Sequence, residues 1–392
     1  MQYSGKVYFF RALVVLVFFS FLSNGLRIDV GINLTLAYFT LSLIFIIPFQ
    51  HNGIIKKSLY INAIPIYAFY LFSILTVIYS IDTETTIRYV FGAILLLYFF
   101  TITVLLFQIE KINLLDTLNK LVVFYVLGTL IYYTLGLLSF DSLQEHSKYY
   151  GIFVEKSLPR LIGFTIDPNF AALTLLFCFF IALNNRSKFG KVILVLCLFL
   201  IAATLSRSGL LALLFSMLFG QVLSGDFKKL ALSIGGISFL ILLTIMLVFF
   251  GYADITELIE KRISGIRGGA GRLDLWSNAL TLFEMNPIFG SGAFTFRELN
   301  ELFFDSDRFA HNTYIEVMVE MGAVGGFLFL LMNIHLFYLS YTLRRIYSFM
   351  LPISISFIIM SATLSLYINT ITVFYFVLVL LAYEESKKSM RL

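Results

Sequence analysis

Long apolar runs separated by short polar interruptions fill the sequence from Val7 to Leu381. One membrane-spanning helix needs roughly 20 predominantly apolar residues, and about twelve runs approach that length. The pattern therefore predicts an all-α fold, a polytopic membrane helical bundle of about 12 transmembrane helices in a single transmembrane domain over residues 1–392. The predicted spans are 7–25, 31–50, 60–80, 89–108, 119–140, 165–184, 191–206, 208–223, 230–251, 312–340, 346–365 and 367–384.

The composition is that of a membrane protein. The chain is 59% hydrophobic and 13% charged, with a mean hydropathy of +0.92, far from the proportions of soluble domains. The first 25 residues join a basic flank to an apolar run but lack a small-residue cleavage site, so we predict an uncleaved first helix. The cysteines, Cys178 and Cys197, lie within apolar runs and are expected to behave as small hydrophobes. The sequence has no metal-ligand spacing and no GxxxxGK[ST] loop, so we expect no metal, no cofactor and no nucleic-acid partner.

The distribution of lysine and arginine predicts the membrane topology. Loops that bear lysine alternate with loops that are poor in it, and by the positive-inside rule both termini are cytoplasmic. This assignment leaves two substantial segments outside, 141–160 and a large periplasmic loop at 252–310 between late helices. Sorted in this way, 11 Lys and 5 Arg lie inside, whereas 3 Lys and 9 Arg lie outside.

The outward excess of arginine has two interpretations. A guanidinium group presents a planar fork of donors that binds phosphate oxygens in pairs, and an ammonium group does not. The excess then indicates phosphate recognition. Alternatively, the positive-inside rule keeps lysine inside and the outer arginines pair with carboxylates, since the 252–310 segment has 6 basic and 9 acidic residues.

Arg207 interrupts an apolar stretch, 192–224, whose flanks both have the lysines of cytoplasmic loops. The chain must therefore cross the membrane twice here, and two full crossings need about 40 residues. Because fewer are present, we expect the turn at Arg207 to lie below the outer surface. An ionisable group at that depth is a functional-site candidate, and a lipid phosphate is a suitable partner.

The helix predicted after the long outer loop begins with His311 and Asn312 and contains Glu316 and Glu320. Asn312, Glu316 and Glu320 follow one another at intervals of four residues, so they form one polar stripe that runs inward from the surface. Buried carboxylates in a membrane must be paired, protonated or hydrated, and the outer arginines are candidate partners for them. His311 is either a general base that acts near neutral pH or the cap of this helix.

Two glycines, Gly322 and Gly325, are expected to let another helix pack closely against this one. With His311 and Asn312 they follow the spacing His-[Asn/Ser/Gln]-x9-Gly-x-x-Gly, and the segment resembles the motif of the O-antigen ligase and O-antigen polymerase superfamily of membrane glycosyltransferases. Three further pieces are similar to that family in the same order, and together they cover about the C-terminal 60% of the chain. They are "RLIGFTIDPNFAAL" (160–173), "TLSRSGLLALL" (204–214) and "GRLDLWSNALTLFEMNPIFGSGAFTF" (271–296).

The resemblance implies an inverting, metal-independent transfer of a glycan from an undecaprenyl pyrophosphate carrier to an acceptor hydroxyl. It implies that Arg207 and Arg272, which match the family's arginines, bind the pyrophosphate, with Arg160 as a third candidate. A pyrophosphate leaves easily only when its charge is stabilised, which preorganised arginines can do.

The resemblance also implies that His311, supported by Asn312 or Glu316, accepts the proton of the attacking hydroxyl. In "DPN" (167–169) the proline favours a helix start. Asp167 and Asn169 are therefore predicted to be structural, with sugar binding as the alternative.

The resemblance leaves the acceptor open. A polymerase joins lipid-linked repeat units of O-antigen, capsule or exopolysaccharide, whereas a ligase transfers the glycan to the lipid A core of lipopolysaccharide; we favour the polymerase. The expected partners are the undecaprenyl-pyrophosphate-linked glycan, the lipids of the bacterial cytoplasmic (inner) membrane and, as a candidate, a chain-length regulator. A secondary transporter or lipid flippase is the alternative from another class, but such proteins concentrate charge near the midplane. A scaffold without catalysis would leave His311 and Arg207 unexplained.

Overall fold

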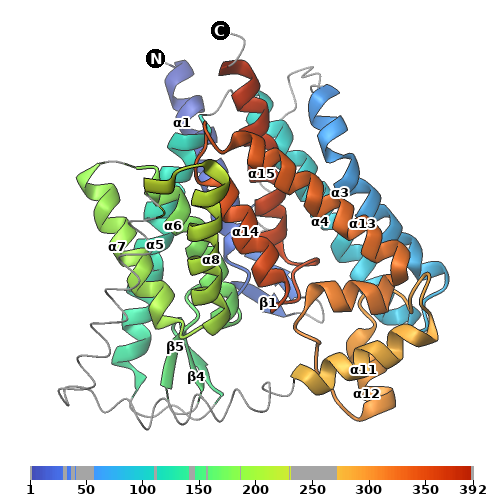
Figure 1. The fold of residues 1–392 in the computed structure, drawn as a ribbon. Coiled ribbons are helices and arrows are strands. Elements are labelled where there is room, and N and C mark those ends of the chain that lie inside the picture. Colours follow the sequence, from blue (N-terminus) through green and yellow to red (C-terminus); the bar gives the residue numbers. More distant parts are fainter. Residues whose placement is uncertain are drawn as a thin grey trace.

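The computed structural model describes residues 2–29, 33–36, 40, 57–109, 113–140, 146–155, 158–185, 187–228, 230 and 272–389. Within these ranges the chain is predominantly helical (Figure 1). The helices are α1 (Gln2–Leu22), α3 (Lys57–Leu75), α4 (Thr83–Ile109), α5 (Leu114–Leu138), α6 (Pro168–Leu183), α7 (Lys188–Ala203), α8 (Arg207–Ser224), α11 (Arg272–Met285), α12 (Phe296–Phe304), α13 (Thr313–Leu343), α14 (Met350–Ser361) and α15 (Thr370–Ser389), with a 3-10 turn at Thr76–Ile78.

Five stretches of the described residues are long and apolar enough to cross a membrane, and they make the chain an all-α membrane protein. These stretches are Leu59–Ile78, Thr83–Phe107, Leu114–Leu138, Arg207–Ser224 and Thr313–Leu343. Shorter apolar helices occur at Ala12–Leu22, Pro168–Leu183 and Met350–Ser361. The predicted span 230–251, most of 31–50 and the first part of the predicted 252–310 loop lie outside the described residues.

Two small sheets were not predicted. Strands β1 (Arg27–Asp29) and β2 (Asn33–Thr35) form an antiparallel pair, so the predicted span 31–50 does not begin as a helix. Strands β3 (Lys148–Tyr149), β4 (Ile152–Glu155) and β5 (Leu158–Leu161) form a three-stranded antiparallel sheet, with Phe153 paired to Arg160. The β4 side chains alternate between buried and half-buried, which is the period of a strand with one covered face.

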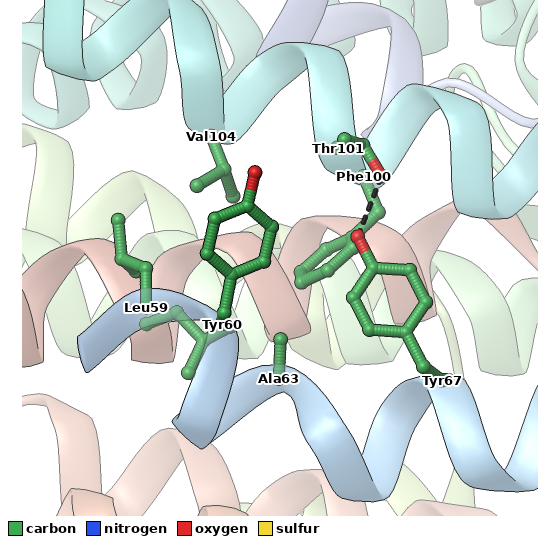
Figure 2. A pocket seen from close by; sticks show the side chains of 8 residues that line it. Leu59, Tyr60, Ala63, Tyr67, Phe100, Thr101 and Val104 are labelled. Carbon is green, nitrogen blue, oxygen red and sulfur yellow. Dashed lines mark hydrogen bonds between the residues drawn. The ribbon is translucent and has the colours of Figure 1, made fainter. Parts of the chain in front are cut away.

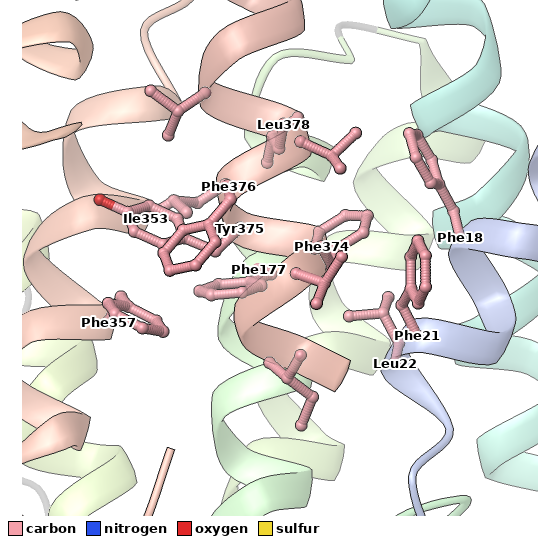
Figure 3. Packing of buried hydrophobic residues seen from close by; sticks show 14 of the residues in the cluster. Phe18, Phe21, Leu22, Phe177, Ile353, Phe357, Phe374, Tyr375, Phe376 and Leu378 are labelled. Carbon is pink, nitrogen blue, oxygen red and sulfur yellow. The ribbon is translucent and has the colours of Figure 1, made fainter. Parts of the chain in front are cut away.

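The centre of the bundle is packed by aromatic rings. Figure 3 shows Phe374 and Tyr375 of α15 between Phe177 of α6, Phe357 of α14 and Phe18 of α1. The Phe357 and Tyr375 rings stack with centroids 4.3 Å apart, and the Phe18 ring meets that of Phe374 edge-on at 5.2 Å. Offset stacking and edge-to-face contacts are the favoured geometries of such pairs. These contacts fix α15 as the central helix.

The bundle has two distinct ends. The start of α1 and the end of α15 lie at one end, whereas β4, β5, α11 and α12 lie at the opposite end (Figure 1). The turn that leads into α8 belongs to this second end, because Arg160 of β5 donates a hydrogen bond from Nε to the carbonyl of Thr204 over 3.0 Å. Segments far apart in the sequence therefore meet there.

A small pocket lies between α3 and α4, with Leu380 of α15 as a further lining residue (Figure 2). Its polar contact joins the hydroxyl of Tyr67 to that of Thr101 at 2.7 Å. None of the residues singled out in the sequence lines it, so this pocket is separate from the candidate site.

Candidate functional site

Asn312 caps α13 and thereby places His311 just outside the helix. The Asn312 side-chain oxygen accepts hydrogen bonds from the backbone N–H groups of Tyr314 (3.1 Å) and Ile315 (3.3 Å), which is the geometry of an N-cap. His311 has a φ of 50°, in the left-handed region that few side chains adopt. The alternative in which His311 caps the helix is therefore wrong, because Asn312 makes the cap.

Glu316 holds the turn in this conformation. Its carboxyl group is buried, and Oε1 accepts hydrogen bonds from the backbone N–H of His311 (3.1 Å) and from the hydroxyl of Ser365 (2.7 Å). Both predicted supporting residues thus act on the backbone around His311. They fix the backbone position from which the His311 side chain projects.

Three charged groups act on the imidazole of His311. Burial lowers the pKa of the imidazole, the positive charges of Arg272 and Arg308 lower it further, and the negative charge of Asp167 raises it. Burial and the charges of Arg207 and Arg308 lower the pKa of Arg272, whereas the negative charge of Asp167 raises that pKa. Because such interactions fall off with distance, Arg272, Arg308 and Asp167 are neighbours of His311, whereas Arg207 is a neighbour of Arg272.

Short helix caps position Arg207 and Asp167. Ser206 caps α8, with its hydroxyl oxygen accepting from the N–H of Gly209 (3.1 Å), and Asp167 caps α6, accepting from the N–H of Asn169 (2.7 Å). The Ser206 hydroxyl also donates to the side-chain oxygen of Asn169 over 2.6 Å. The starts of α6 and α8 are therefore fastened together, which is the structural task predicted for Asp167 and Asn169.

Arg160 has partners within its own neighbourhood. Its guanidinium forms an ion pair with Glu155 of the adjoining strand and bonds the carbonyl of Thr204, and its side chain is only 14% exposed. This arrangement ties β5 to the turn before α8. Since Glu155 already balances its charge, Arg160 is the least suited of the three predicted arginines to bind a phosphate.

The glycine motif breaks α13 rather than accommodating another helix at Gly322. Gly322 has φ 64° and ψ −166°, outside the helical region, and a β-carbon there would overlap the Ile288 carbonyl. The closely packed partner is the loop after α11, so the prediction of helix packing is wrong for Gly322. Gly325 does face α3, where an added β-carbon would lie 3.4 Å from the ring of Phe72, although its nearest neighbour would be Met321 of α13 itself.

The loop backbone replaces the hydrogen bonds that the break removes from α13. The N–H groups of Ser291 and Gly292 donate to the carbonyls of Val319 (3.2 Å) and Glu320 (2.8 Å). In return, the N–H groups at 323 and 324 donate to the carbonyls at 287 (2.8 Å) and 288 (3.1 Å). Irregular backbone within a membrane protein is tolerated where protein satisfies it in this way.

Glu320, the deepest member of the polar stripe, fastens three segments. Its buried carboxylate accepts a hydrogen bond from the N–H of Phe296 at the start of α12 (3.2 Å) and another from the hydroxyl of Tyr367. A carboxylate at a helix N-terminus is favourable because the orphan N–H groups lie there. Among the residues that the structure describes, the partners of Glu316 and Glu320 are hydroxyl groups and backbone N–H groups rather than the outer arginines named as candidates.

Sequence reasoning did not single out Arg308, and the structure shows how it is placed. The Asn300 side-chain amide donates to the carbonyls of Ser306 (2.7 Å) and Arg308 (3.2 Å), and Asn278 donates to Asn300 over 2.9 Å. Two asparagines on α11 and α12 thus hold the loop that carries Arg308. The sequence signal that could have pointed to Arg308 was the excess of arginine in the predicted outer segments, but that excess does not distinguish one arginine from another.

Among the described residues, no group of His, Cys, Asp and Glu is arranged to hold a metal ion. Comparison with family models matches residues 192–330 to the family described as O-Antigen ligase, a region that contains Arg207, Arg272 and His311 but not Arg160. No curated protein matches the chain. The family match confirms the predicted resemblance, in that residues 192–330 are similar to the O-antigen ligase family.

Proposed function

We propose that this membrane protein transfers a glycan from an undecaprenyl pyrophosphate carrier to an acceptor hydroxyl, and that it polymerises repeat units of O-antigen, capsule or exopolysaccharide. The proximity of Arg272 to His311, and of Arg207 to Arg272, supports this proposal most directly. The family match supports glycosyl transfer in general. In this proposal the leaving group and the attacking group meet at one polar cluster.

Arg207 and Arg272 bind the pyrophosphate of the donor in this scheme. Each guanidinium can donate two parallel hydrogen bonds to phosphate oxygens. The backbone of both arginines is held in place before the reaction, because Arg207 is the first residue of the capped helix α8 and Arg272 is the first residue of α11. Preorganised positive charge stabilises the negative charge that develops on the departing diphosphate.

His311 acts as the general base. The acceptor hydroxyl oxygen attacks the anomeric carbon and forms the new glycosidic bond, while the bond from that carbon to the diphosphate oxygen breaks and the anomeric centre inverts. The hydroxyl proton passes to the imidazole, whose pKa is lowered by burial and by the charges of Arg272 and Arg308, so that its neutral, proton-accepting form is favoured. The negative charge of Asp167 then stabilises the imidazolium that forms.

The ligase reaction is the second candidate, and the description of the matching family favours it. It uses the same donor and the same cluster, but its acceptor is the lipid A core. A transporter would use the break in α13 as an ion or substrate site. In this chain the break is filled by hydrogen-bonded backbone from 287–292, which favours catalysis over transport.

The proposed topology follows from the sequence and agrees with the arrangement in Figure 1, where α11 and α12 lie opposite the start of α1. The bundle would cross the bacterial cytoplasmic membrane about twelve times, with both termini cytoplasmic and the 252–310 segment periplasmic. The arginine cluster then faces the side on which lipid-linked glycans are assembled into polymers.

The test is a transfer assay with purified protein and a lipid-linked oligosaccharide. His311→Ala and Arg207→Ala are expected to abolish product formation, and turnover near that of the wild type would reject the assignment. Deletion of the gene followed by gel analysis separates the two reactions. Loss of a polymerase leaves single repeat units on the surface glycan, whereas loss of a ligase leaves long chains on the carrier.

A further inference from the structure

The chain has a single tryptophan, Trp276, and its indole is bonded to the His311 turn. The indole N–H donates to the carbonyl of Ala310 over 3.1 Å. Ala310 is buried and immediately precedes His311. The bond therefore ends one residue before the imidazole.

Trp276 joins this turn to the helix that carries Arg272. The two residues are separated by four positions on α11, so their side chains lie on the same face, about 6 Å apart along the helix axis. The first turn of α11 thus carries both the Arg272 guanidinium and the indole that bonds to the backbone just before His311.

The indole belongs to a small apolar core distinct from the main one. Trp276 packs against a cluster from α11, α12, the loop before α13 and α13 itself, whose buried members are Ala279, Leu282, Phe296, Leu299, Ala310 and Val319. Residues 305–312 have no helix or strand, so side chains must hold them in place. Glu316 holds the His311 turn from the α13 side, and Trp276 holds it from the α11 side.

We propose that Trp276 is a positioning residue, whose indole N–H sets the separation between the diphosphate-binding Arg272 and the basic imidazole of His311. This inference rests on the proposed function. The reaction requires both groups to act on one donor at the same time, and a misplacement of about 1 Å can slow an enzyme on the order of 100-fold. A helix and an irregular turn hold such a separation only if they are bonded to each other.

Two replacements test the bond. Trp276→Phe removes the donor together with part of the ring. Benzothienylalanine at this position replaces the N–H by sulfur while keeping the ring shape. Because the chain has one tryptophan, expression in a tryptophan auxotroph introduces benzothienylalanine at this position alone. Both are expected to lower kcat about 100-fold while the KM for the lipid-linked donor stays near its wild-type value, because Arg207 and Arg272 remain in place. An unchanged kcat in the isosteric variant overturns the proposal, and so does a loss confined to KM.

A second measurement does not depend on glycosyl transfer. The emission of Trp276 is expected to change with pH as His311 protonates, with a midpoint below about 6.5 that is shaped by the neighbouring Arg272, Arg308 and Asp167. The change is expected to vanish in His311→Gln. If wild-type protein shows this titration but transfers no glycan, the proposed function fails while the placement of Trp276 stands. If the emission does not respond to His311, the placement itself is refuted.

Discussion

Replacing Gly322 by alanine tests the break in α13 quantitatively. The native φ of 64° and ψ of −166° lie in a region open essentially to glycine alone, and occupying it with a side chain costs about 1–3 kcal/mol. The new β-carbon would also overlap the carbonyl of Ile288, so the loop at 287–292 must move away.

Four backbone hydrogen bonds join that loop to α13. Each contributes about 0.5–1.5 kcal/mol to stability. If the loop withdraws, strain and lost hydrogen bonds together lower the free energy of unfolding by roughly 3–9 kcal/mol. Typical single substitutions cost about 0.5–3 kcal/mol, so the expected loss is larger than that of an average site.

Gly92→Ala is the matched control. Gly92 lies inside α4, and a β-carbon added there would have no atom within 4 Å. Alanine is the better helix former by about 1 kcal/mol, so this variant should equal or exceed the wild type. Unfolding in mixed micelles titrated with a denaturing detergent measures both. If Gly322→Ala proves as stable as Gly92→Ala, the account of the break is refuted.

Three further predictions concern the cluster around His311. Arg207→Lys keeps the charge but loses the planar fork of donors, and we expect transfer to fall at least about 10-fold; Arg344→Lys, at the far end of α13, should leave the rate unchanged, and equal rates for both variants would contradict phosphate binding by Arg207. Because burial and the neighbouring arginines depress the pKa of His311 while Asp167 raises it, the acidic limb of the kcat/KM profile should lie below pH 6.5, and Asp167→Asn should move it to lower pH; a limb that stays in place or moves upward argues against this base. Glu316→Gln keeps an oxygen that can accept from both His311 and Ser365 and should retain most activity, whereas Glu316→Ala should lose on the order of 100-fold; similar rates for both would show that the bond to the turn is dispensable.

Local patterns in the sequence were enough to predict most of the helical bundle. The apolar runs that form α4 and α5 need only their length and composition to be recognised as spans. Helix caps are equally short-range, since Asp167 bonds a backbone N–H two residues away and Asn312 bonds those two and three residues away. The start of α13 was predicted, but the sequence alone did not distinguish Asn312 from His311 as its cap. The spacing from His311 to Gly325 led to the family that the comparison confirms.

What local patterns could not supply are contacts between residues far apart in the chain. Glu320 is held by Tyr367, 47 positions later, and Phe296, 24 positions earlier, so its partners depend on how three segments fold together. Gly322 looked like a helix-packing glycine because local patterns do not show its backbone angles. Those angles depend on the loop 287–292, which lies 30 to 35 positions earlier in the chain and enters the break. Apolar periodicity and caps act over one or two helix turns and can be read along the chain, whereas the partner of a buried carboxylate or a displaced N–H is chosen by whichever segment the packing brings within about 3 Å.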